Sequence, residues 1–241
     1  MSCEVAGFGL STGGRIGIIS RMWFRGMVVM AWLGGAAVAA AGDFARLEAA
    51  AVPAGYLARL LLNESPFPGE RGYVSEEDSK ATMLSILWVL HSRMNYIPPG
   101  YKQEEIAAIR SQNVIEVITA KNQCEGFSKD AAGKPVAAPR VEERLRYLTQ
   151  IANRGDKPGR FANLLNFGQG LASAYLAGGI PGADRFAGLT VVNQVAVTGR
   201  AYSWMTGQDY YSPGGNFVKI PDSLQGLLGG NRFFTLRKDP Q

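Results

Sequence analysis

The pattern of apolar residues changes at Gly178, and this change limits the chain to a mixed fold in which the helices come first. Before Gly178, apolar residues recur three and four positions apart within segments separated by proline- and glycine-rich breaks, as in amphipathic helices. The predicted helices cover residues 55–64, 75–94, 103–120, 141–153 and 161–177, and residues 121–139 form a polar loop. After Gly178, short runs at 188–199, 216–220 and 232–236 predict strands. We therefore expect a mainly helical α+β domain with a small β-rich C-terminal part.

The composition fits a globular protein and excludes several classes of site. Of the 241 residues, 46% are apolar and 19% are charged, which allows an ordinary core. The net charge of +5 is mild and scattered, whereas a nucleic-acid-binding surface needs basic residues gathered on one face. One histidine, His91, and two cysteines, Cys3 and Cys124, are too few for a zinc site built from those residue types. We predict no metal, no cofactor and no nucleic-acid partner.

Residues 1–41 are predicted to be an export segment. Arg21 and Arg25 precede an apolar stretch, and the small residues at 37–41 suit cleavage of a signal peptide. A membrane anchor is the alternative, but the apolar run is shorter than the ~20 strongly apolar residues that a membrane span needs. The sequence therefore predicts a periplasmic or secreted domain of residues 42–241.

Glu64 is the most informative residue of the first predicted helix. Leu57, Leu60, Leu61 and Glu64 share one helix face, so a carboxyl group lies on the apolar stripe at the last turn. The C-terminal end of a helix and apolar neighbours both disfavour a negative charge. Such a carboxyl group favours its protonated form, which a general acid needs in order to cleave a glycosidic bond. The alternative is that Glu64 pairs with a cation such as Arg59, or turns into solvent.

Several segments resemble one protein family when they are taken in order. They are Leu57–Ser65 with Ala81–Met94, Val117–Ala120 with Gln123–Ser128, Gly199–Trp204, and Gly229–Phe234. The chain thereby resembles the cell wall hydrolase family typified by spore cortex-lytic enzymes, whose first helix follows the pattern A-R-x-(V/I)-x-x-E-A. The likeness spans residues 55–236, with an insertion around 130–165.

The resemblance implies a lysozyme-like or transglycosylase-like fold that cleaves the glycan strands of peptidoglycan. Carried over by position, the acid/base role of the family's glutamate falls on Glu64. The chain departs from the family pattern at Ser65 and Pro66, where the family has alanine and arginine, and at Arg232, near which the family has a histidine.

The second catalytic group is open at this point. A two-carboxylate hydrolase needs a partner for Glu64, and the candidates are Glu70, Glu125 and Asp209. A lytic transglycosylase works with one glutamate, because the 6-hydroxyl group of the sugar attacks the anomeric carbon. Without a well-placed second acid in the sequence, we favour the transglycosylase mechanism.

Aromatic and amide side chains supply the surface for a sugar. We predict that Gln123, Phe127, Tyr202 and Asn231 bind substrate, because aromatic faces and amides suit sugar rings and their substituents. Further candidates are Trp204, Tyr210, Tyr211, Asn193 and Gln194. The alternative for each aromatic ring is burial in the core, and we favour burial for Trp204.

Two other functions stay open. The chain could be a non-catalytic cell-wall-binding module of the same fold, or a peptidase or amidase in which Cys124 is the nucleophile and His91 the base. A satisfied histidine in an apolar helix is the commoner situation for His91, and Cys124 does not begin a helix. The predicted partner is peptidoglycan. A cognate inhibitor protein is expected if the protein attacks competing cells.

Overall fold

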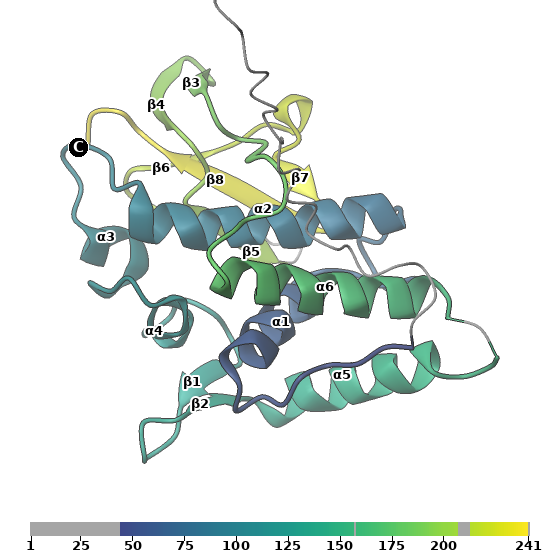
Figure 1. The fold of residues 1–241 in the computed structure, drawn as a ribbon. Helices are drawn as coiled ribbons and strands as arrows, with labels where there is room; N and C mark the ends of the chain where they lie inside the picture. The colour runs from purple at the N-terminus through teal and green to yellow at the C-terminus, as the bar shows by residue number, and fades with distance from the viewer. Residues whose placement is uncertain (1–43, 157, 207–212, 241) are drawn as a thin grey trace, which may run out of the picture. The chain divides into compact units, whose positions relative to one another are not determined.

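The helices that follow the N-terminal segment are arranged around α1, which is buried on every side. The computed structural model describes residues 44–156, 158–206 and 213–240, so the predicted export segment lies outside the described residues. The helices are α1 (Pro53–Asn63), α2 (Glu76–Asn95), α3 (Gln103–Ala107), α4 (Val114–Thr119), α5 (Pro139–Ala152) and α6 (Arg160–Leu176). Helices α2 and α6 run side by side, α5 lies beyond α6, and α1 packs against all three (Figure 1).

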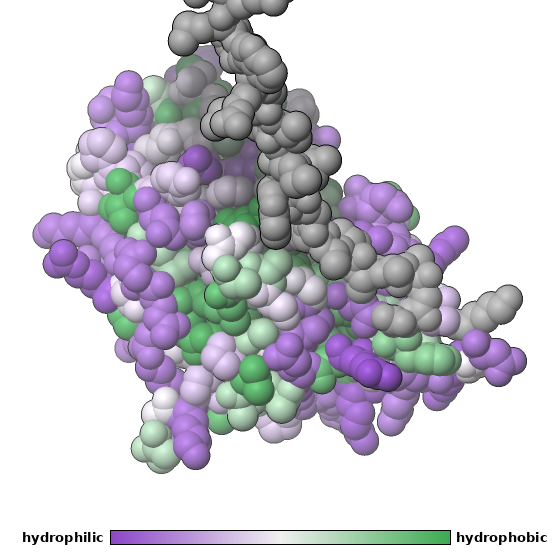
Figure 2. Space-filling view, in the orientation of Figure 1, coloured by the Kyte–Doolittle hydropathy of each residue, from purple (hydrophilic) through white to green (hydrophobic). Residues whose placement is uncertain are grey.

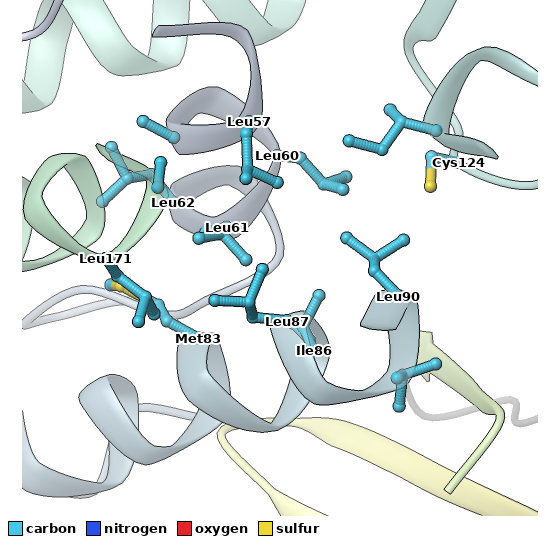
Figure 3. Packing of buried hydrophobic residues seen from close by; sticks show 14 of the residues in the cluster. Leu57, Leu60, Leu61, Leu62, Met83, Ile86, Leu87, Leu90, Cys124 and Leu171 are labelled. Carbon is cyan, nitrogen blue, oxygen red and sulfur yellow. The ribbon is translucent and has the colours of Figure 1, made fainter. Parts of the chain in front are cut away.

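The sequence of α1 explains its central place. Pro53 begins the helix, where its missing N–H costs nothing, and Ala54–Leu62 are all buried. Leu60 and Leu61 face α2, and Leu62 meets Leu171 of α6 (Figure 3). Helix α6 approaches closely because Gly168 faces Leu62, and a Cβ atom there would lie 2.7 Å from the Leu62 Cδ2 atom. The helix is therefore buried all round rather than along a single stripe.

The predicted third helix is divided in two, and this part of the prediction was wrong. Helix α3 ends at Ala107, because the next residue, Ala108, adopts a left-handed conformation with φ of 56°. The Gln103 side chain then bonds both the N–H and the carbonyl of Ser111, which closes the loop between the helices. Asn113 caps α4 by accepting a hydrogen bond from the N–H of Ile115. Local polar caps thus override the continuous apolar pattern.

The predicted polar loop contains a short hairpin that the sequence pattern did not reveal. Strands β1 (Phe127–Lys129) and β2 (Pro135–Ala137) pair antiparallel. The Tyr56 hydroxyl of α1 lies 3.2 Å from the Ser128 carbonyl and 3.1 Å from the Val136 carbonyl. The hairpin is therefore held to the central helix.

The C-terminal part forms strands, as predicted; they pair antiparallel, and two of them lie outside the predicted runs. The strands are β3 (Leu189–Val192), β4 (Val195–Gly199), β5 (Ser203–Thr206), β6 (Phe217–Lys219), β7 (Leu227–Leu228) and β8 (Asn231–Leu236). The run at 188–199 is a hairpin, because Asn193 and Gln194 both take the positive φ that a tight turn needs. In the main sheet β8 lies between β5 and β6, and β7 also pairs with β8. This confirms a mixed α+β fold.

The described helices include none that combines the length and apolar character needed to cross a bilayer. Residues 44–240, where described, belong to a single compact unit. Helix α2 contacts β5 and β7, so the sheet rests against the helical body at the end where α1 terminates.

Candidate active site

A groove of about 720 Å³ opens where α1 ends. It lies between the loop that follows α1, the first turn of α2, the end of β5 and the turn between β7 and β8. Its lining consists of Asn63–Pro66, Glu70–Gly72, Val74, Asp78, Arg144, Thr206 and Leu227–Gly230. Gly72 and Gly230 make close backbone contact here, because a Cβ atom on Gly72 would lie 3.0 Å from the Gly230 Cα atom. Gly72, whose φ of 87° also favours glycine, therefore lets the two loops approach this closely.

Glu64 lies in this groove and is held by uncharged donors. It is the C-cap residue of α1, one position beyond the last helical residue. The indole N–H of Trp204 donates to its Oε2 atom at 3.2 Å, and the side-chain amide of Asn63 donates to Oε1 at 3.2 Å. The Thr206 hydroxyl makes a short contact with Oε2. None of the ion pairs in the described part of the chain includes Glu64, and Arg59 pairs with Glu142 at 2.6 Å instead.

The sheet brings the two C-terminal segments of the predicted site together at Glu64. Strands β5 and β8 pair antiparallel, with Thr206 opposite Asn231. Trp204 and Thr206 are two positions apart, so both side chains leave β5 on the same face. The Asn231 amide nitrogen donates to the Glu64 carbonyl at 2.6 Å, and the Asn231 Oδ1 atom lies 2.7 Å from the Thr206 hydroxyl. Asn231, predicted as a substrate ligand, is fully buried and joins α1 to the sheet.

Arg144 of α5 binds the carboxyl-terminal end of α1. Its guanidinium group donates to the carbonyl of Leu62, in the last turn of α1, at 2.9 Å and to the carbonyl of Ser65, in the loop beyond the helix, at 3.0 Å. It also grips Glu70 with two nitrogens, at 2.6 and 3.0 Å. The second oxygen of Glu70 also accepts from the Phe67 N–H at 2.7 Å. Glu70 is thus fully engaged in holding the loop.

Arg93 connects two more of the predicted residues to the site. It is buried, and its guanidinium donates to the Tyr202 carbonyl at 2.7 Å and to the Gln123 side-chain oxygen at 2.9 Å. Burial lowers the pKa of Arg93 to about 10. The guanidinium also stacks over Trp204, 5.1 Å from the centre of its ring. Gln123 and Tyr202 therefore hold the guanidinium group that lies over Trp204, and neither residue lines the groove.

The two predicted sugar-stacking rings are packed in the interior. Phe127 is buried and meets the ring of Tyr56 edge to face at 5.5 Å. Tyr202 is 1% exposed, its hydroxyl donates to the Tyr96 carbonyl at 2.6 Å, and burial raises its pKa to about 12. Their large apolar surfaces account for this placement. Trp204 is also buried, as its apolar character favoured, but its N–H reaches Glu64.

The remaining carboxyl candidates are distributed over different places. Glu125 is exposed and pairs with Arg140 outside the groove. Asp209, together with Tyr210 and Tyr211, lies outside the described residues. Asp78, in the first turn of α2, was not among the predicted candidates, and it lines the groove with Glu64.

Cys124 and His91 lie in different surroundings. Cys124 belongs to the apolar cluster that includes Leu60 and Leu90 (Figure 3), and burial raises the pKa of its thiol to about 12. His91 lines a separate hollow of about 570 Å³ between α2, α4 and α6. Apolar residues lie on this face of the molecule (Figure 2). Its Nδ1 atom lies 3.1 Å from the Asn95 amide nitrogen, and burial lowers its pKa. A thiol with a raised pKa is a poor nucleophile, and the described hydrogen bonds include none between these two residues.

Sequence reasoning missed Thr206, Arg93 and Arg144 as parts of the site. Thr206 could have been found from its spacing of two from Trp204 in a short strand. Arg144 carries no local signal, because its contacts with α1 join residues about eighty positions apart. Within the residues that the structure describes, no group of three His, Cys, Asp or Glu side chains is placed to hold a metal ion.

Comparison of the chain with protein-family models, with curated proteins and with solved structures gave no match. The resemblance to cell wall hydrolases accordingly stays a prediction from the sequence.

Proposed function

We propose that this protein cleaves the glycan strands of peptidoglycan, with Glu64 as the general acid. The observation that carries the proposal is the setting of the Glu64 carboxyl group, which faces a groove and is contacted by neutral donors from Asn63, Trp204 and Thr206. None of the described ion pairs ties this carboxyl group to a cation, so it can take part in proton transfer at the groove. That is the property required of a group that protonates a leaving oxygen.

The reaction begins with proton transfer from Glu64 to the glycosidic oxygen. The O–H bond of the carboxyl group breaks, a new O–H bond forms on the leaving sugar, and the bond from the anomeric carbon to that oxygen breaks. The N–H groups of Trp204 and Asn63 then hydrogen-bond to the carboxylate that remains. Glu64 recovers its proton from the nucleophile that attacks the anomeric carbon.

That nucleophile is either a water molecule or the 6-hydroxyl group of the sugar. Glu70, which lines the same groove, is held by Arg144 and by the Phe67 N–H, so it is unsuited to act as a base. Asp78 also lines the groove and is the remaining described carboxyl group there. We favour the 6-hydroxyl group, and therefore a lytic transglycosylase, since Glu64 then serves alone as acid and base.

The proposal extends to fold and location. The order of the motifs supports a lysozyme-like or transglycosylase-like fold, and the pattern of residues 1–41 supports export to the periplasm or beyond. The groove is formed by a helix end and a sheet edge, so its two sides come from segments far apart in the chain.

The test is digestion of purified peptidoglycan by the full chain and by Glu64→Gln, with products identified by mass. We expect fragments ending in 1,6-anhydro-muramic acid from the wild type and none from the variant, because an amide keeps the shape but cannot donate the proton. The matched control is Glu104→Gln, an exposed glutamate outside the groove, which should digest like the wild type.

Other products would redirect the proposal. Reducing ends would indicate a hydrolase, and Asp78→Asn would then be the next variant to examine. Free stem peptides would assign the chemistry to a peptidase or amidase. Binding to peptidoglycan without any product would indicate a non-catalytic wall-binding module.

A further inference from the structure

The hollow that His91 lines is formed by the end of α2, the beginning of α4, the end of α6 and residues 178–180. Its volume of about 570 Å³ lies within the range of roughly 300–1,000 Å³ that is usual for ligand sites. Val114 and Ile115 supply buried apolar side chains, and Tyr175 supplies an aromatic ring. None of the described residues that line the hollow is charged near neutral pH, because burial lowers the pKa of His91. The hollow therefore suits an uncharged ligand.

Three exposed amide side chains line this hollow, and a backbone group fixes the orientation of each. The Asn95 nitrogen donates to the His91 carbonyl at 3.1 Å, and the Gln112 nitrogen donates to the Met94 carbonyl at 2.7 Å. The Asn113 oxygen accepts the backbone N–H that caps α4. Turning any of these amides over would bring two acceptors or two donors together, so their orientations are determined.

The other atom of each amide has no partner among the described hydrogen bonds. These atoms are the acceptors Oδ1 of Asn95 and Oε1 of Gln112, and the donor Nδ2 of Asn113. The hollow thus combines two acceptors and a donor, in fixed orientations, with apolar side chains. An acetamido group has the complementary set, because its N–H donates, its carbonyl oxygen accepts and its methyl group is apolar.

We propose that this hollow is a second binding site for glycan, which holds an uncharged N-acetylated sugar by its acetamido group. Asn113 donates to the carbonyl oxygen of that group, and Asn95 or Gln112 accepts its N–H. The methyl group packs on the apolar side chains at the beginning of α4. The ring of Tyr175 offers an aromatic surface to the sugar ring.

The lining favours the glycan over the peptide part of peptidoglycan. Stem peptides carry free carboxyl groups, which cationic side chains bind best, and no described residue of the lining supplies a cation. N-acetylglucosamine, by contrast, carries an acetamido group and no charge. That the bound glycan belongs to peptidoglycan rests on the proposed function, whereas binding of an N-acetylated sugar does not.

The hollow is too far from Glu64 to hold the sugars at the cleaved bond. Asp78 lines the groove and Asn95 lines the hollow, and both belong to α2. At a rise of 1.5 Å per residue, the helix places them about 25 Å apart. A glycan in the hollow therefore leaves the groove open, and its expected role is to keep the protein on the polymer between cleavages.

The test uses His91 as a reporter, because it is the only histidine of the chain. Isotope-labelled histidine then gives a single imidazole NMR signal, and that signal comes from the hollow. The full chain with Glu64→Gln, which lacks the proposed acid, is titrated with tetra-N-acetylchitotetraose at about pH 8, where His91 is neutral. We expect a saturable shift of the signal. The deacetylated tetramer, which has no acetamido group, should leave the signal in place.

The decisive variant is Asn113→Asp, added to the same chain. Aspartate keeps the oxygen that caps α4 but lacks the N–H donor, so the fold should remain while the sugar binds about tenfold more weakly, the effect of one hydrogen bond. The matched control is Gln150→Glu, which makes the same change of amide to acid on the exposed side of α5, outside the hollow. It should bind like the parent chain.

Several outcomes would overturn the proposal. They are a His91 signal that does not respond to the acetylated tetramer, an equal response to the deacetylated one, and unchanged binding by Asn113→Asp. A response to a free stem peptide but not to the sugar would show a peptide site instead. If the wild type cleaves no peptidoglycan, the proposed function fails, while the His91 titration still decides whether the hollow binds N-acetylated sugars.

Discussion

Glu64 and Glu70 line the same groove, but the regions around them hold their carboxyl groups by opposite means. Around Glu70, the guanidinium of Arg144 grips both oxygens and ties the loop to α5. Around Glu64, the contacts come from an indole, an amide and a hydroxyl group supplied by α1 and β5. An ion pair fixes a carboxylate in its charged form, whereas neutral partners leave a carboxyl group free to gain and lose a proton.

The difference shows how one groove can separate stability from chemistry. Arg144 satisfies the helix-end carbonyls and the charge of Glu70 together, so α1 ends at a fixed place. Glu64 follows the last residue of the helix, so its position is fixed as well, but it takes no part in the ion pair between Arg144 and Glu70. A general acid needs such precise placement together with an exchangeable proton.

The largest expected effect comes from exchanging the two glutamates separately for glutamine. Glu64→Gln should lower the rate of peptidoglycan cleavage by about a hundredfold or more, the usual contribution of a general acid, with little change in unfolding. Glu70→Gln should instead lower the free energy of unfolding and spare the rate per folded molecule. Rates and urea unfolding of both variants check this. The comparison breaks if Glu70→Gln abolishes cleavage while the protein stays folded.

The next effect is on stability and concerns Arg144. Arg144→Met removes the donors to the Leu62 and Ser65 carbonyls and leaves Glu70 without its cation, so we expect unfolding to become easier by about 2 kcal/mol. Glu70→Gln should cost less, because the bonds to the carbonyls remain. A double-mutant cycle by denaturant unfolding measures the coupling between the two side chains. Equal costs for the two single variants would show that the helix-end bonds contribute nothing.

A smaller effect is expected at Trp204. Trp204→Phe removes the N–H that reaches Glu64 but keeps an aromatic face over Arg93. The cleavage rate should fall severalfold, as for the loss of one weak hydrogen bond, and the midpoint of unfolding should move little. Trp204→Ala serves as the contrast, because it also exposes the buried Arg93 and should unfold the protein far more easily. If Trp204→Phe cleaves as fast as the wild type, the indole has only a packing role.

The sequence predicted the coarse fold and the position of Glu64 because both depend on local patterns. The helical spacing of Leu57, Leu60 and Leu61 is readable within a few residues. The sequence did not predict the division of the third helix. The division depends on the left-handed backbone of Ala108 and on the capping of α4 by Asn113, and the spacing of apolar residues reports neither. The spacing alone does not distinguish a helix with one buried stripe from one buried all round.

The partners of Glu64 were only partly predictable, because they depend on strand pairing. Asn231 was chosen as a polar residue in a glycine-rich segment, but its place beneath Glu64 follows from the register that sets it opposite Thr206. Phe127 and Tyr202 were predicted to bind substrate because they are aromatic rings near polar residues. Both rings are instead buried in the core, because their apolar area favours burial. No local pattern says which of two faces of a short strand meets a helix end.

The smallest expected effect concerns His91, which separates the pH response of the fold from that of the groove. Burial, and secondarily the charge of Arg200, lowers the pKa of His91 below its ordinary value of 6.5. The unfolded chain therefore binds a proton in a pH range where the folded protein does not, and the free energy of unfolding should rise with pH up to about 6.5. His91→Gln should flatten this slope when urea unfolding is measured between pH 5 and 7.

The pH profile of cleavage by His91→Gln should stay that of the wild type, because His91 lies in a different hollow from Glu64. A change in that profile would mean that the two regions are coupled through α2, and the groove could then not be treated as the sole origin of pH-dependent activity.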